Sequence, residues 1–209
     1  MAEQVPHRPH AERGQGQVAR GRPTGQVRER ACGLSGRLCL SFTATVGERW
    51  RRNFERLPQP ADLGRWFVAA GLLDVPPAVT EEGLRSARRL REAIYRTALA
   101  GTRDEPGGDG DRRVINAHAR RGGLAPQLTA RRSVELRPGR SPVADALATV
   151  ARDAVDLLGG PDITRVRECS SHDCALLFLD TSRPGRRRWC SDRACGNRAR
   201  AAAHRARHS

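Results

Sequence analysis

The chain contains no lysine, and all 38 of its basic residues are arginine. It therefore cannot supply the amine of a Schiff-base enzyme or the phosphate-binding lysine of a P-loop from its own side chains. It also has no apolar run of about 18 residues, so we expect no transmembrane helix. Residues 1–30 lack the apolar segment of a secretory signal, which predicts a cytoplasmic protein whose thiols bind metal rather than form disulfides.

The net charge of +15 is concentrated at the C-terminus. Residues 183–209 carry nine arginines and a single acidic residue, Asp192, which gives this segment more than half of the net charge. A coding bias would explain the replacement of lysine by arginine, but it would not explain the clustering. Clustered positive charge is typical of a nucleic-acid contact, and the alternative is a solvated basic tail.

Four cysteines near the C-terminus form two pairs of equal spacing, Cys169 with Cys174 and Cys190 with Cys195. Four thiolates can close a tetrahedral structural zinc site, and the matched spacing favours zinc over disulfides or ordinary buried thiols. His172 lies inside the first pair and could replace a cysteine, although a surface histidine is the preferred interpretation. Cys32 and Cys39 have no partner pattern, which indicates buried or free thiols.

Hydrophobic spacing predicts an α+β fold whose larger part is mostly helical. We expect a disordered basic tail over 1–33, a helical domain with a few short strands over 34–160, and a small zinc module over 161–209. Helices should follow Pro60 and Thr80 and should cover 112–121 and 142–158, because apolar residues recur there at helical spacing. Strands are expected over 38–46, which is rich in apolar and β-branched residues, over 133–137 and over 175–180.

The final helix should begin near Ser191 and carry arginines spaced seven apart, so that pairs of them share a face. Such a helix can enter a major groove, where arginine reads guanine and neighbouring arginines hold phosphates. Few aromatic residues adjoin these arginines in the sequence, which argues against a single-strand stacking platform.

The segment R-x-C-x4-C-x-x-L-F-L-D-T-S-R-x-x-x-R-R-W-C-S-x-x-x-C-G-N-R resembles the CGNR zinc finger, over roughly residues 163–208. Upstream, L-C-L-S-F-T-A-T-V-G-E-R and L-P-Q-P-A-D-L-G-R-W-F-V-A-A-G-L-L resemble the opening of the ABATE domain, which accompanies this finger in bacteria. The resemblance implies a zinc-binding and DNA-binding protein, a candidate stress-induced transcription regulator, with the four cysteines as zinc ligands. The expected nucleic-acid contacts are Arg183, Arg187, Arg188, Arg193, Asn197, Arg198, Arg200, Arg205 and Arg207, with Asn197 and Arg198 alternatively bracing the finger.

The sequence therefore predicts a bacterial transcription regulator with a C-terminal Cys₄ finger of hairpin and helix, and an N-terminal domain for sensing or dimerisation. The expected partner is DNA, with binding in the cytoplasm at the nucleoid, no membrane contact, and a homodimer compatible with the sequence. An RNA-binding or protein-interaction zinc module is the alternative. An enzyme is not expected, because there is no H-E-x-x-H pair, nucleophile elbow or open three-ligand metal site, and His118 is isolated.

Overall fold

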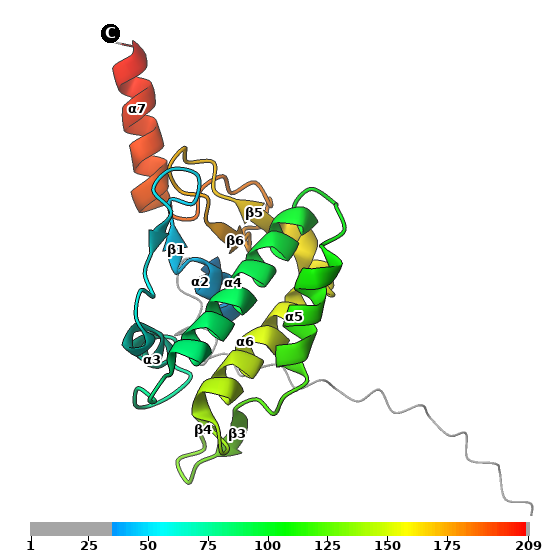
Figure 1. Ribbon diagram of the computed structural model, residues 1–209. Coiled ribbons are helices and arrows are strands. Elements are labelled where there is room, and N and C mark those ends of the chain that lie inside the picture. The colour runs from blue at the N-terminus through cyan, green and yellow to red at the C-terminus, as the bar shows by residue number, and fades with distance from the viewer. Residues whose placement is uncertain (1–34, 208–209) are drawn as a thin grey trace, which may run out of the picture.

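The computed structural model describes residues 35–207, so the tail predicted over 1–33 and Cys32 lie outside the described residues. Helices and short antiparallel strand pairs alternate along this part of the chain (Figure 1). In chain order the elements are the helices and strands α2 (Leu38–Thr43), β1 (Val46–Gly47), β2 (Phe54–Glu55), α3 (Pro60–Ala69), α4 (Glu81–Gly101), α5 (Asp109–Ala119), β3 (Ala125–Leu128), β4 (Val134–Arg137), α6 (Pro142–Leu158), β5 (Val166–Glu168), β6 (Leu177–Leu179) and α7 (Asn197–Arg207), with a 3₁₀ helix at Pro161–Arg165 and a π-helical turn at Asp192–Gly196.

Helices α4, α5 and α6 pack against one another, and α2 packs against α4 and α6. Helix α4 begins where the sequence predicts it, because the Thr80 hydroxyl accepts a hydrogen bond from the Gly83 N–H at 3.1 Å and thereby caps the first turn. Its apolar stripe from Leu84 to Ala98 is buried, as the helical spacing indicates. The mostly helical α+β class predicted from the sequence is thus confirmed.

The strand predicted over 38–46 is wrong: residues Leu38–Thr43 form a helix, and only Val46 and Gly47 are in a strand. This helix is buried on nearly every side, so its sequence is mostly apolar and shows no helical periodicity. A hydrogen bond from the Cys39 N–H to the Asp153 carboxylate of α6, at 2.9 Å, caps α2 from outside. Tertiary contacts therefore decide the conformation of this segment, against its local propensity.

Strand β6 connects the C-terminal module to the helical part of the molecule. Its side chains alternate between the two faces: Leu177 and Leu179 join the main hydrophobic core, whereas Phe178 joins a second cluster with three of the cysteines. Gly36 lies close to β6, and a Cβ atom at this position would come within 3.3 Å of the Leu179 Cβ. One short strand thus contributes to both cores.

Candidate metal centre and nucleic-acid interface

The first cysteine pair lies on the tight turn between β5 and β6. The Cys169 N–H donates to the Leu176 carbonyl at 2.9 Å, and the Cys174 N–H donates to the Ser171 carbonyl at 3.0 Å. Ala175, the next residue, adopts a left-handed conformation with φ of 52°. This geometry folds the turn back so that both thiols lie on the same side.

The second pair is held by the loop after β6 and by the π-helical turn. The Asp180 carboxylate is buried and accepts hydrogen bonds from the N–H groups of Ser182 and Arg187 at 2.9 Å each, which fixes the loop. Burial opposes ionisation of Asp180, but these hydrogen bonds outweigh it and hold the pKa of the carboxyl below its ordinary value. The Ser191 hydroxyl accepts from the Ala194 N–H at 3.2 Å, which caps the helical turn that carries Cys195.

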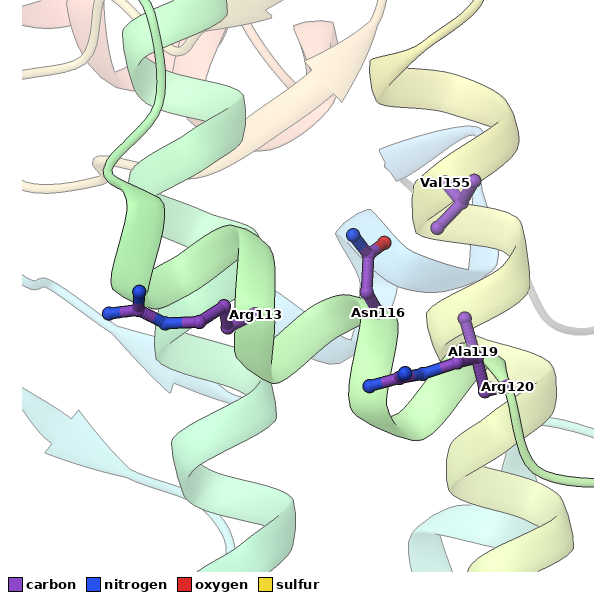
Figure 2. A pocket seen from close by; sticks show the side chains of 5 residues that line it. All are labelled: Arg113, Asn116, Ala119, Arg120 and Val155. Atoms are coloured by element: carbon purple, nitrogen blue, oxygen red, sulfur yellow. The ribbon is translucent and has the colours of Figure 1, made fainter.

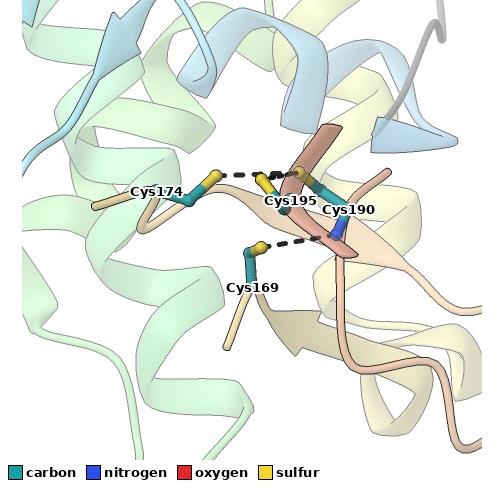
Figure 3. A group of neighbouring side chains, drawn as sticks. All are labelled: Cys169, Cys174, Cys190 and Cys195. Carbon is teal, nitrogen blue, oxygen red and sulfur yellow. Dashed lines mark hydrogen bonds between the residues drawn. The ribbon is translucent and has the colours of Figure 1, made fainter. Parts of the chain in front are cut away.

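The four sulfur atoms of Cys169, Cys174, Cys190 and Cys195 lie within 4.8 Å of one another (Figure 3). The Cys174–Cys190 and Cys190–Cys195 sulfur distances are both 3.6 Å. A tetrahedron with zinc–sulfur bonds of about 2.3 Å has sulfur–sulfur edges of about 3.8 Å, whereas a disulfide would require about 2.05 Å. All four cysteines are free, and their spacing fits a tetrahedral metal site.

The thiols of this cluster lie close enough to form hydrogen bonds with one another. Hydrogen bonds from the Cys174 and Cys190 thiols lower the pKa of Cys169, and the Cys190 N–H adds a further bond to the Cys169 sulfur at 3.4 Å. The same contacts with Cys169 raise the pKa values of Cys174 and Cys190. A divalent cation would replace the protons shared by these sulfurs, so the donor set suits a thiophilic metal.

Two arginines brace the cluster from the outside. The Arg198 guanidinium donates to the Cys195 sulfur at 3.1 Å, where its charge would offset part of the negative charge of four thiolates. The Arg187 guanidinium lies 4.7 Å from the centre of the Phe178 ring and donates to the carbonyls of Trp189 and Cys190. These contacts hold the second cysteine pair against the Phe178 side chain.

Among the described residues, the other thiol and the histidines named by the sequence do not join the cluster. The His172 side chain is 93% exposed and pairs with Asp173, as a surface histidine would. Cys39 is fully buried in α2, and burial, with the nearby Asp153 carboxylate, raises the pKa of its thiol. His118 is half-buried between α5 and α4, with its Nε2 atom 3.1 Å from the Ser86 hydroxyl.

The basic residues of the module divide into two groups. One group is bound within the module: besides Arg187 and Arg198, the Arg200 guanidinium contacts Asp192 at 3.0 Å and the Asn197 side-chain oxygen at 2.6 Å. Arg198 and Arg200 are nevertheless exposed. The other group is also exposed, around the cluster and along α7, and consists of Arg183, Arg186, Arg188, Arg193, Arg205 and Arg207. Helix α7 contains no acidic residue and projects away from the rest of the molecule (Figure 1).

Sequence reasoning missed the attachment of the N-terminal part to the first cysteine turn. The Trp50 indole N–H donates to Glu168 at 2.9 Å, and Arg51 pairs with Asp173 at 3.2 Å. The Tyr95 hydroxyl of α4 approaches the Ala175 carbonyl at 3.5 Å. These contacts join residues 80 to 122 positions apart, which no local pattern could indicate.

A hollow of about 390 Å³ lies elsewhere, between α5 and α6. Its lining includes Arg113 and Asn116 from α5, Arg120 directly after α5, and Val155 from α6 (Figure 2). None of the four cysteines lines it. None of the helices over residues 35–207 is long and apolar enough to cross a membrane.

Comparison with known families finds two matches along the chain. Residues 36–161 match the ABATE family, described as "Putative stress-induced transcription regulator", and residues 165–208 match the CGNR zinc finger. No curated protein matches the chain. Because the first match covers more than half of the 209 residues, the chain belongs to the ABATE family, and the resemblance seen in its sequence is confirmed.

Proposed function

We propose that this ABATE-family chain is a zinc-dependent DNA-binding transcription regulator. The single observation that carries the proposal is the placement of four metal-binding sulfurs at the base of α7, an acid-free helix with exposed arginines. In this proposal Cys169, Cys174, Cys190 and Cys195 hold Zn²⁺, and the module they organise presents its basic surface to DNA.

The proposed role of zinc is structural. Four thiolates fill a tetrahedral site and leave no position for water or substrate, so the centre would fix the shape of the module rather than perform chemistry. The cluster around the sulfurs is small, with Phe178 as its only large, fully buried side chain. An apolar core of this size is too small to stabilise the module by itself, so we expect the folding of the module to depend on the metal.

The proposed DNA contacts are the exposed arginines of the module, with Arg188 and Arg193 nearest to the cluster in sequence. Arg188 lies against the Trp189 ring, 5.2 Å from its centre, which leaves its guanidinium on the surface. Phosphate contacts by several such side chains release counterions, so DNA affinity should fall steeply as salt rises. We assign bracing roles to Arg187 and Arg198 in addition to any contact that they make with DNA.

The decisive experiment is selection of zinc-loaded protein against a random duplex DNA library at about 150 mM salt. We expect one motif to be enriched, and we expect that Cys190→Ser, which removes one thiolate, abolishes the enrichment. Structured RNA competes in a parallel reaction at the same salt. Stronger competition by RNA than by duplex DNA would reject the DNA assignment, and the absence of binding to either would reject a nucleic-acid function.

A finer test uses Arg193→Ala with Arg65→Ala as its control. Arg193 is exposed beside the cluster, whereas Arg65 is an exposed arginine of α3 paired with Asp62. We expect Arg193→Ala to weaken DNA binding while one zinc per chain is retained, and Arg65→Ala to bind as the wild type does. Equal affinity of the two variants would refute the proposed role of Arg193.

A further inference from the structure

The hairpin formed by β1 and β2 combines exposed aromatic side chains with arginines, next to the cysteine cluster. Trp50 is 62% exposed and Phe54 is 55% exposed. They are two of the five large hydrophobic side chains that lie exposed in residues 35–207. The segment 48–56 also carries four arginines and two glutamates, so its formal charge is positive.

The hairpin tip has a fixed conformation. The N–H groups of Arg51, Arg52 and Asn53 all donate to the Glu48 carbonyl, at 2.9, 3.1 and 2.9 Å respectively. Glu48 and Asn53, which flank the turn, both have φ of 47°. Three hydrogen bonds to one carbonyl give a closed turn, so the backbone of the turn loses little conformational entropy on binding.

The tip is also fastened to the metal module. The Trp50–Glu168 and Arg51–Asp173 contacts attach it to the residues that neighbour Cys169 and Cys174. Figure 1 shows β1 at the end of the molecule from which α7 projects, whereas β3 and β4 lie at the opposite end. The hairpin and the finger therefore share one end of the molecule, although more than 100 residues separate them in sequence.

Not every side chain of the hairpin is available to a partner. Arg49 is bound to Glu92, and Glu55 is bound to the buried Arg91, so neither contributes a free charge. The Arg52 side chain is 71% exposed and is 3.6 Å from Glu48, an exposed pair that holds it only weakly. The Arg56 guanidinium lies 5.3 Å from the centre of the Phe54 ring. The surface left free combines aromatic rings with positive charge.

We propose that this hairpin is a second DNA-contacting element, which binds the same duplex as the finger. Arg52 contacts a phosphate, and Phe54 places its ring against the sugars and base edges of a groove. Duplex DNA fits this surface because the phosphates match its charge and the groove offers apolar edges to its rings. The inference rests on the proposed DNA-binding function, and it enlarges the interface beyond the residues that match the finger family.

The test measures duplex affinity over a range of salt concentrations for the full-length, zinc-loaded chain and four variants. The variants are Arg52→Ala and Phe54→Ala in the hairpin, Arg193→Ala in the finger, and Arg131→Ala as the control. Arg131 is an exposed arginine in the turn between β3 and β4, at the opposite end of the molecule. Circular dichroism and zinc content verify that each variant is folded and loaded.

We expect Arg52→Ala to reduce the slope of log affinity against log salt by about 0.9, the loss of one phosphate contact. Phe54→Ala should weaken binding about five-fold, because it removes the partial burial of an apolar ring in the groove, and should leave the slope unchanged. Arg131→Ala should match the wild type.

If both hairpin variants match Arg131→Ala while Arg193→Ala binds weakly, the hairpin proposal is refuted and the finger proposal stands. If the wild type does not bind duplex DNA, both proposals fail.

Discussion

Substitutions on the two faces of strand β6 should affect different parts of the molecule. Two neighbouring residues of this strand allow the two effects to be measured separately. Leu177 is fully buried in the main core, and Phe178 is fully buried in the cluster beneath the sulfurs. Leu177→Ala removes a large side chain from a packed core, which costs about 2–5 kcal/mol. A domain of this kind has a free energy of unfolding of about 5–15 kcal/mol. The substitution therefore removes a large share of the stability of the helical part.

Urea unfolding followed by far-ultraviolet circular dichroism measures this loss, because most of the helices lie in the main core. With a denaturant dependence of about 2 kcal/mol per molar urea, a loss of 3 kcal/mol moves the midpoint by about 1.5 M. The second measurement is zinc release to a chromogenic chelator. Phe178→Ala should accelerate zinc release strongly, because it removes the aromatic ring that packs against the cysteines and against Arg187.

Leu177→Ala and Phe178→Ala control for each other, since they are adjacent and equally buried. A loss below about 1 kcal/mol for Leu177→Ala would refute the claim that the finger strand stabilises the helical part. Equal effects of the two variants on zinc release would show that the two faces of β6 are not separate.

Three further predictions concern the charged groups. Asp153→Ala should reduce the free energy of unfolding by about 3 kcal/mol in urea titration, because it removes both the cap of α2 and a partner of the buried Arg37; a loss below 1 kcal/mol would contradict this role. Arg198→Ala should weaken zinc retention in a chelator competition, because it removes the guanidinium beside the Cys195 sulfur, and Arg198→Lys should restore retention only in part. Burial opposes ionisation of Glu55, but hydrogen bonds from a buried arginine outweigh it and hold its pKa below the ordinary value. The stability that this carboxylate contributes is therefore present above the unfolded pKa and is lost as pH falls through the lower folded value. Glu55→Gln should accordingly be less stable than the wild type at pH 7, with a difference that shrinks below about pH 4 in pH-dependent thermal denaturation.

The sequence could predict the parts of the fold whose signals are local. Helices α4 and α6 lie where apolar residues recur at helical spacing, and Thr80 caps α4 as its position indicates. The gathering of the four cysteines also follows from their spacing, since each pair spans one turn. In each case a short segment contains the information, and tertiary contacts do not override it.

The parts that could not be predicted depend on partners distant in the chain. Helix α2 is helical because α4 and α6 pack against it and Asp153 caps it. A mostly apolar segment without helical periodicity fits a strand equally well. The hairpin of β1 and β2 has no strand pattern that the sequence could show, since its strands are only two residues long. Its attachment to the cysteine turn through Trp50 and Glu168 has no signature in either segment.

Apart from histidine, every basic side chain of this protein is an arginine. Residue identity alone therefore cannot separate structural from functional basic residues. Burial and partners do separate them. Arg37 and Arg91 are buried, and each binds more than one carboxylate, which is the arrangement of a structural ion pair. Arg198 is exposed but donates to a cysteine sulfur. Arg52 has only an exposed pair with Glu48, and Arg193 is exposed beside the cluster. Because only accessible arginines can exchange counterions for phosphates, the salt dependence of DNA binding should reflect this surface subset and not the total of 38.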